Sequence, residues 1–161
     1  MKPRLSIREK FHLFVATGFG LGLFAPVAPG TVGSLPGVAL AYALALLPPW
    51  AQIPLCLALT LAAIPVCDSA ERTLGTKDDG RIVADEWMLY PISLVGLPLL
   101  DLPWWSMLVF FAVIRLNDIV KLPPARRLQS LPGGRGIVID DFIANLYSLA
   151  VNWAIYWFCF R

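Results

Sequence analysis

The stretch DFIANLYSLAVNWAIYWFCF, residues 141–160, is almost wholly apolar after its first aspartate. At a rise of 1.5 Å per residue, about 20 apolar residues suffice for a helix to cross a lipid bilayer. The residues just before it, GGRGIVIDD, place Asp140 and Asp141 at its entrance. Carboxylates are costly in such a position unless they bind a cation or carry protons. The sequence therefore predicts an all-α membrane protein with a carboxylate site at one bilayer face.

Composition supports the same fold class independently. The 161 residues are 58% hydrophobic and 15% charged, with a mean hydropathy of +0.69, whereas soluble domains are about 25% charged. The net charge of +2 is too small for a typical nucleic-acid-binding protein. This length predicts one domain, residues 1–161, in which residues 1–17 form a basic N-terminal arm.

Five apolar segments can be drawn, which predicts a polytopic helical bundle of about four to five membrane segments after a Gly/Pro-rich N-terminal loop. They comprise residues 35–47, 50–67, 87–100, 104–120 and 141–160. Segments 35–47 and 87–100 are short and either thin the bilayer or pair as buried hairpins. Lys and Arg concentrate in the arm and in residues 72–81 and 115–135, which share one side if every segment crosses. The positive-inside rule places that side in the cytoplasm.

Four acids lie close together in KDDGRIVADE, residues 77–86. A helix N-cap would explain one of them, but not four beside an apolar helix. Oxygen ligands of this kind suit Mg²⁺, which commonly takes one or two carboxylates together with waters and substrate phosphate oxygens. We therefore expect a metal-binding or proton-handling role for Asp85 and Glu86. A single histidine in the chain argues against zinc.

Basic residues accompany a further acid in VIRLNDIVKLPPARR, residues 113–127. Arg115 and Asp118 are three residues apart and share one helix face, which fits an intrahelical ion pair. In a functional reading, Asp118 adds a ligand and nearby basic side chains face an anionic group. Those side chains are Arg115, Lys121 and Arg126. For Arg127 and Arg135, contact with anionic lipid headgroups is the alternative.

Two other patterns are polar. In GTVGS, residues 30–34, backbone amides and hydroxyls lead into an apolar helix and are candidates for anion binding, with N-capping by Ser34 as the competing explanation. The candidate substrate-binding residues there are Gly30, Thr31 and Ser34. In the last segment, polar residues recur at i, i+4, i+7 and i+11, so we expect this stripe to face the protein interior. They are Asp141, Asn145, Ser148 and Asn152.

Four motifs, taken in order, resemble the phosphatidylglycerophosphatase A family. They are GFGLGLFAPVAPGTVGSL, DDGRIVADE, IRLNDIVK and GGRGIVIDD, and they cover the chain from about Gly18 to Asn145. Members of this family remove the terminal phosphate of phosphatidylglycerophosphate, with Mg²⁺, to give phosphatidylglycerol. The resemblance implies a membrane-embedded lipid phosphatase domain in the bacterial inner membrane, multi-pass, with its site facing the cytoplasm and its lipid substrate in the bilayer.

The resemblance also implies roles for particular side chains. The metal ligands would be Asp78, Asp85, Glu86, Asp118, Asp140 and Asp141. The catalytic residues would be Asp85, Glu86, Asp118, Asp141, Arg115 and Lys121, with Arg126 as a further phosphate partner. The number of metal ions, and attack by water or by a carboxylate, stay open at this point.

Two alternatives belong to other classes. A CDP-alcohol phosphotransferase also uses acids and Mg²⁺, but its D-G-x2-A-R pattern fails after Asp79-Gly80. A small cation or proton carrier would place its acids at mid-helix, whereas the sequence places them at helix mouths.

Overall fold

The chain is all-helical, as the sequence predicts. A computed structural model describes residues 5–24, 27–77, 79–128 and 130–161, and none of these lies in a strand. The helices are α1 (Ile7–Ala16), α2 (Leu21–Phe24), α3 (Pro29–Gly33), α4 (Leu35–Ala45), α5 (Pro49–Leu74), α6 (Ala84–Leu89), the 3-10 helix η1 (Tyr90–Leu94), α7 (Ser106–Val120), α8 (Ala125–Leu128) and α9 (Gly134–Cys159). Asp78, a predicted metal ligand, lies outside the described residues.

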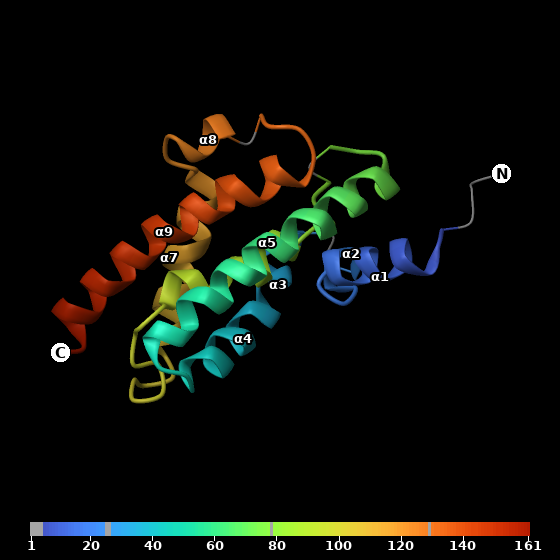
Figure 1. The fold of residues 1–161 in the computed structure, drawn as a ribbon. Coiled ribbons are helices and arrows are strands. Elements are labelled where there is room, and N and C mark those ends of the chain that lie inside the picture. The colour runs from blue at the N-terminus through green and yellow to red at the C-terminus, as the bar shows by residue number, and fades with distance from the viewer. Residues whose placement is uncertain (1–4, 25–26, 78, 129) are drawn as a thin grey trace.

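Helices α5 and α9 form the long axis of the molecule and pack side by side in opposite directions (Figure 1). The start of α9 packs against the second half of α5, where a Cβ on Gly134 would collide with the α5 backbone at Ile64 and Asp68. Each helix has 26 residues and is apolar enough to cross a bilayer, and within the described residues no other helix meets that criterion. The expectation of four to five membrane segments stays a prediction.

The beginning of α9 differs from the predicted boundary. The apolar pattern starts at Asp141, but the helix already begins at Gly134. Asp140 and Asp141 therefore lie inside the helix, about 10 Å along its axis, and not at its mouth. Both carboxylates are buried against the rest of the bundle.

The predicted segment 87–100 is shorter and more irregular than one membrane helix. Helix α6 starts at Ala84 and gives way at Tyr90 to η1, which has Pro91 in its first turn. Proline cannot donate the backbone hydrogen bond that would continue an α-helix. The chain then turns, and Gln52 of α5 accepts a hydrogen bond from the Gly96 N–H at 2.9 Å. This segment thus packs as a buried wedge against α5 and α9.

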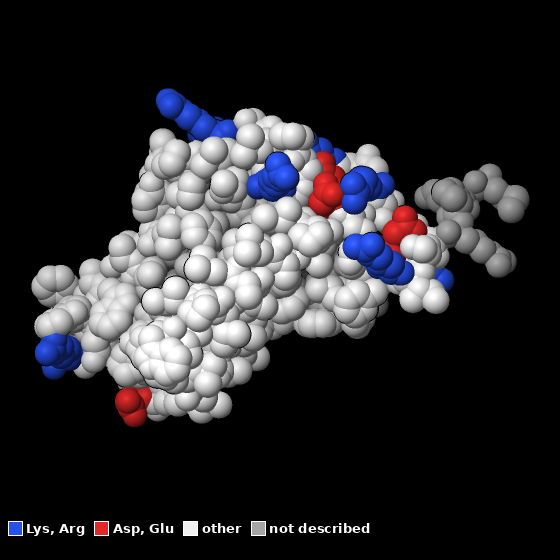
Figure 2. Space-filling view, in the orientation of Figure 1, with Lys and Arg blue, Asp and Glu red and all other residues white. Residues whose placement is uncertain are grey.

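Charged side chains are unevenly distributed over the surface. On the face shown in Figure 2, charged side chains lie toward the ends of the molecule and the surface between them is uncharged. Large apolar side chains are also exposed, among them Leu57 and Leu61 of α5 and Leu108 of α7. Trp50 and Trp104 are 76% and 75% exposed at the turns remote from Lys77. This exposure fits an aromatic belt at a membrane interface better than a role in the core.

Candidate active site

Side chains from widely separated parts of the sequence converge on a pocket of about 290 Å³. Helix α3 contributes Gly30 and Thr31 to the pocket. The other walls of the pocket come from α6, from the end of α7 and from α9. The charged residues in its lining are Asp85, Glu86, Arg115, Asp118, Lys121 and Asp141. The structure therefore brings together most of the predicted catalytic and metal-ligating residues in one place.

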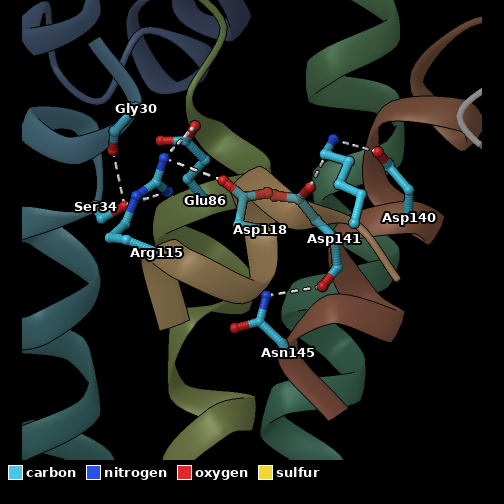
Figure 3. A network of polar contacts seen from close by, with 9 residues as sticks. Gly30, Ser34, Glu86, Arg115, Asp118, Asp140, Asp141 and Asn145 are labelled. Carbon is cyan, nitrogen blue, oxygen red and sulfur yellow. Dashed lines mark hydrogen bonds and ion pairs between the residues drawn. The ribbon is translucent and has the colours of Figure 1, made fainter. Parts of the chain in front are cut away.

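Arg115 is the central cation of the pocket (Figure 3). Its Nη2 lies 3.0 Å from Asp118 Oδ2 and 3.5 Å from Glu86 Oε1. The pair with Asp118 is the intrahelical contact that the i, i+3 spacing predicts, while the contact with Glu86 joins α7 to α6. Both functions expected of this spacing, an ion pair and a place in a charged site, are compatible with this geometry.

The GTVGS segment holds Arg115 and Glu86 from the opposite side. Arg115 Nη1 donates to Ser34 Oγ at 3.1 Å, and that hydroxyl donates to the Gly30 carbonyl at 2.8 Å. Ser34 is 1% exposed and makes no side-chain N-cap bond, so N-capping does not explain its position. Gly30 lies so close to Glu86 that a Cβ would overlap the carboxylate. Direct contact of Ser34 with substrate stays a prediction.

Lys121 connects α7 to the acids of α9. It follows the last residue of α7 with a left-handed backbone, φ 45°, a conformation that commonly ends a helix. Its ammonium forms a close ion pair with Asp140 and lies 3.5 Å from Asp141 Oδ1. Asp140 is fully buried and reaches the site through Lys121, since it does not line the pocket itself.

The site contains more acidic than basic side chains, and burial and neighbouring charges shift the pKa values of several of them. Burial, followed by the negative charges of Glu86 and Asp118, raises the pKa of Asp85 well above its ordinary value. Burial raises the pKa of Glu86 to about 7, although the charge of Arg115 acts in the opposite direction. Burial lowers the pKa of Lys121, but the neighbouring carboxylates outweigh burial and raise it above its ordinary value. Added positive charge would therefore stabilise the ionised acids.

Three buried polar atoms of pocket residues have no hydrogen-bond partner within the described part of the chain. They are Asp85 Oδ1, Glu86 Oε2 and Arg115 Nε. A buried polar atom without a partner carries a desolvation cost of about 1–3 kcal/mol, so native structures usually supply a partner. Two vacant acceptors suit a cation and one vacant donor suits an anion.

The carboxylate oxygens of the pocket fit Mg²⁺ as a small set of protein ligands. Among the described residues, no three His, Cys, Asp or Glu side chains are arranged to hold a metal ion. Mg²⁺ is usually bound through one or two carboxylates, with waters and substrate phosphate oxygens completing its octahedron. Asp85 and Glu86, with their vacant acceptor oxygens, meet that smaller requirement.

The sequence is similar to known proteins along most of its length. The profile of a family described as Phosphatidylglycerophosphatase A matches residues 14–156. The chain belongs to the phosphatidylglycerophosphatase A family. A phosphatidylglycerophosphatase A from Escherichia coli (strain K12) is 35% identical over 156 residues, covering 96% of this chain and 88% of that protein. One from Haemophilus influenzae is 38% identical over 160 residues, covering 96% and 94%.

A third relative has a different name. A Bacteroides thetaiotaomicron protein, provisionally named a phosphatidylinositol-3-phosphatase, is 36% identical over 141 residues, covering 84% of this chain and 87% of that protein. No solved structure matches the chain significantly. The names of all three relatives describe removal of a phosphate from a phospholipid headgroup.

One predicted site residue of this family member lies apart from the pocket, and so does an acid that neighbours the predicted ligands in sequence. Arg126 is on α8, is exposed and does not line the pocket. Asp79, in the same acidic segment as Asp85, pairs with Arg81 at 2.6 Å near the surface. The acidic motif thus divides between a surface ion pair and the pocket.

The polar stripe of α9 faces the interior, as predicted. Asn145 Nδ2 donates to the Asp141 carbonyl at 2.8 Å, and Asn152 Nδ2 donates to the Ser93 carbonyl of η1 at 3.0 Å. Ser93 Oγ forms a close hydrogen bond with Asn145 Oδ1. Asn145 therefore connects η1 to the helical turn that presents Asp141.

The partners of this stripe could not be predicted from the apolar and polar pattern of the sequence. Ser93 lies in a mainly apolar run, and Asn117 of α7 donates to Ser148 Oγ at 3.1 Å. A lone hydroxyl in an apolar segment is the signal that points to Ser93, because such a group needs an interior partner. Its partner on α9 cannot be deduced without the packing of η1 against that helix.

Proposed function

We propose that this protein is a Mg²⁺-dependent lipid phosphatase that removes the terminal phosphate of phosphatidylglycerophosphate and releases phosphatidylglycerol. Membership of the family and the names of two relatives support the activity. The observation that carries the metal is the pair of vacant acceptor oxygens on Asp85 and Glu86, beside the vacant donor of Arg115. One pocket thus provides for a cation and for a phosphate.

Asp85 and Glu86 would hold the ion, with Asp118 and Asp141 in the same pocket as further acidic neighbours. When bound, Mg²⁺ supplies positive charge that polarises the phosphoryl group and offsets the charge developing on its oxygens. Because Gly30 has no Cβ, the α3 backbone packs directly against the Glu86 carboxylate and limits its movement. Preorganised charges of this kind need little rearrangement during the reaction.

Arg115 and Lys121 would bind the phosphate. Arg115 already has three fixed protein contacts, which leave its Nε–H for an incoming oxygen. Lys121 is held by the acids of α9 and keeps its positive charge because of them. Guanidinium and ammonium groups stabilise the charge spread over the equatorial oxygens in phosphoryl transfer.

The substrate's acyl chains would stay in the bilayer while its headgroup reaches the pocket. Helices α5 and α9 supply the candidate membrane spans. The pocket lies toward the end of the molecule that carries most of its Lys and Arg, which by the positive-inside rule is the cytoplasmic end. We therefore place the site at the cytoplasmic face of the bacterial inner membrane.

Phosphate release from phosphatidylglycerophosphate in mixed micelles tests this proposal. We expect release with Mg²⁺ and loss of release after complete chelation, restored by added Mg²⁺. Asp85→Asn should abolish turnover, because an amide keeps the volume but loses the charge that binds the cation. Asp101→Asn is the matched control, since Asp101 is an exposed acid in the loop before α7. It should retain the wild-type rate.

Other outcomes would favour other functions. Undiminished turnover after chelation would remove the metal from the mechanism. Faster release from phosphatidylinositol-3-phosphate would assign this chain the activity named for the Bacteroides relative. Transfer of a phosphatidyl group without phosphate release would indicate a phosphotransferase. Cation flux into vesicles without any hydrolysis would indicate a carrier.

A further inference from the structure

A groove of about 430 Å³ runs between α5 and α9, separate from the pocket described above. Its apolar lining includes Leu57, Leu61, Ile64, Val138, Ile139 and Phe142. Thr60 also lines it, but the Thr60 hydroxyl already donates to the Cys56 carbonyl at 2.9 Å. The interior of the groove is therefore suited to a hydrocarbon and not to a polar ligand.

A single basic side chain, Arg135, lines the groove. Arg135 is exposed and makes no salt bridge within the described residues. It lies next to Gly134, where α9 touches the α5 backbone, so the helices are in contact there and the groove extends beyond that contact. From Arg135 to Phe142, the groove follows α9 for about 10 Å into the uncharged part of the molecule. The positively charged Arg135 thus lies at one end of the apolar groove.

We propose that this groove binds an acyl chain of an anionic phospholipid from the bilayer, whose headgroup phosphate pairs with Arg135. Arginine forms charge-assisted hydrogen bonds with phosphate, and its position leaves the apolar groove for the chain. A second protein chain would instead need an acidic group opposite Arg135. The membrane is the source of the ligand, because both walls of the groove are candidate membrane spans.

This lipid would not be a substrate in position for hydrolysis. On α9, Asp140 and Asp141 face Lys121 from α7, whereas Val138 and Phe142 face α5. A phosphate on Arg135 would therefore lie on another side of α9 from the catalytic acids. The inference rests on the proposed membrane placement and is independent of the phosphatase chemistry.

The test uses the full-length protein in phosphatidylcholine nanodiscs with a trace of photoactivatable phospholipid. Two probes carry the same labelled acyl chain, one with a phosphatidylglycerol and one with a phosphatidylcholine headgroup. Cross-links are mapped by mass spectrometry. We expect both probes to label residues 57–64 and 138–142, with a clear excess for the anionic probe. Arg135→Gln should reduce that excess about fivefold, the factor for one basic residue near an anionic lipid. It should affect labelling by the zwitterionic probe less, because the choline cation offsets the charge of that probe's phosphate.

Matched variants separate the groove from ordinary lipid contact. Leu61→Trp should fill the groove and lower labelling by both probes, whereas Leu108→Trp, at a similarly exposed position on α7, should not. Arg127→Gln, an exposed arginine on α8, should leave the anionic excess intact. Equal labelling by the two probes, or an excess that survives Arg135→Gln, would overturn the proposal. Protection of the groove from both probes in a dimeric protein would assign it to a second copy of the chain, even if labelling elsewhere confirmed the membrane placement.

Discussion

At the scale of single residues, Gly30 lets the α3 backbone lie directly against the Glu86 carboxylate, because it has no side chain. Gly30→Ala should abolish most of the phosphatase activity, since the new Cβ would displace Glu86. Gly80→Ala is a close control, because Gly80 lines the same pocket but its Cβ would meet only Pro29, at 3.7 Å. We expect Gly80→Ala to retain activity in the micelle assay. Equal losses in both variants would mean that the pocket tolerates no added volume at all.

A second prediction at this scale concerns Ser34, whose hydroxyl accepts a hydrogen bond from Arg115. Ser34→Ala would remove the acceptor for Arg115 Nη1, and we expect kcat/KM to fall about tenfold, since a hydrogen bond to a charged group contributes about 1.5 kcal/mol. Thr73→Ala removes a hydroxyl that also bonds the carbonyl four residues earlier but lies on α5 away from the pocket. That variant should keep the wild-type kcat/KM. An unchanged value for Ser34→Ala would show that Glu86 and Asp118 suffice to orient Arg115.

At the scale of helices, the polar stripe of α9 connects it to η1. Asn152→Leu should lower the stability in detergent by about 1 kcal/mol, because it removes the inter-helix hydrogen bond to the Ser93 carbonyl. Asn152 is eleven residues beyond Asp141, about 16 Å along the axis, so the Mg²⁺ dependence of activity should not change. Val151→Leu, at an exposed neighbouring position, controls for the substitution itself. A shifted Mg²⁺ requirement in Asn152→Leu would extend the site deeper into the bundle.

Apolar runs predicted the existence and class of the main helices, but contacts between helices determined their limits. GGRG has low helix propensity, yet Gly134 starts α9 because close contact with α5 requires a residue without a side chain. Charge patterns likewise predicted the acids of the pocket. They did not predict the hydrogen bond between Arg115 and Ser34 or the ion pair between Lys121 and Asp140, because both contacts join separate segments of the chain.

At the scale of the whole molecule, the two ends of α5 should lie on opposite sides of the membrane. Gly96 lies beside the start of α5, because its N–H donates to the side chain of Gln52. Lys77 follows the end of α5, and its ammonium donates to the Ser130 carbonyl at 3.4 Å. In cells, a cysteine introduced by Lys77→Cys should react only after the inner membrane is permeabilised. One introduced by Asp101→Cys should react with an impermeant maleimide from the periplasm.

One native cysteine must be removed before the two reporter cysteines are labelled. Cys56 and Cys67 are buried, but Cys159 is exposed, so both reporters are placed in Cys159→Ser. Labelling of the Lys77 reporter in intact cells, with the Asp101 reporter protected, would invert the orientation and place the pocket on the periplasmic side.

The small volume of the pocket that holds Asp85 and Arg115 has a consequence for inhibitor discovery. About 290 Å³ is at the lower limit for small-molecule sites and holds a phosphorylated glycerol unit, but not fatty tails. Recognition should therefore depend on the headgroup, and acyl length should matter chiefly through partition into the membrane. Water-soluble phosphate esters without tails should compete with the lipid, which allows fragment screening of this enzyme in detergent without a lipid-like scaffold.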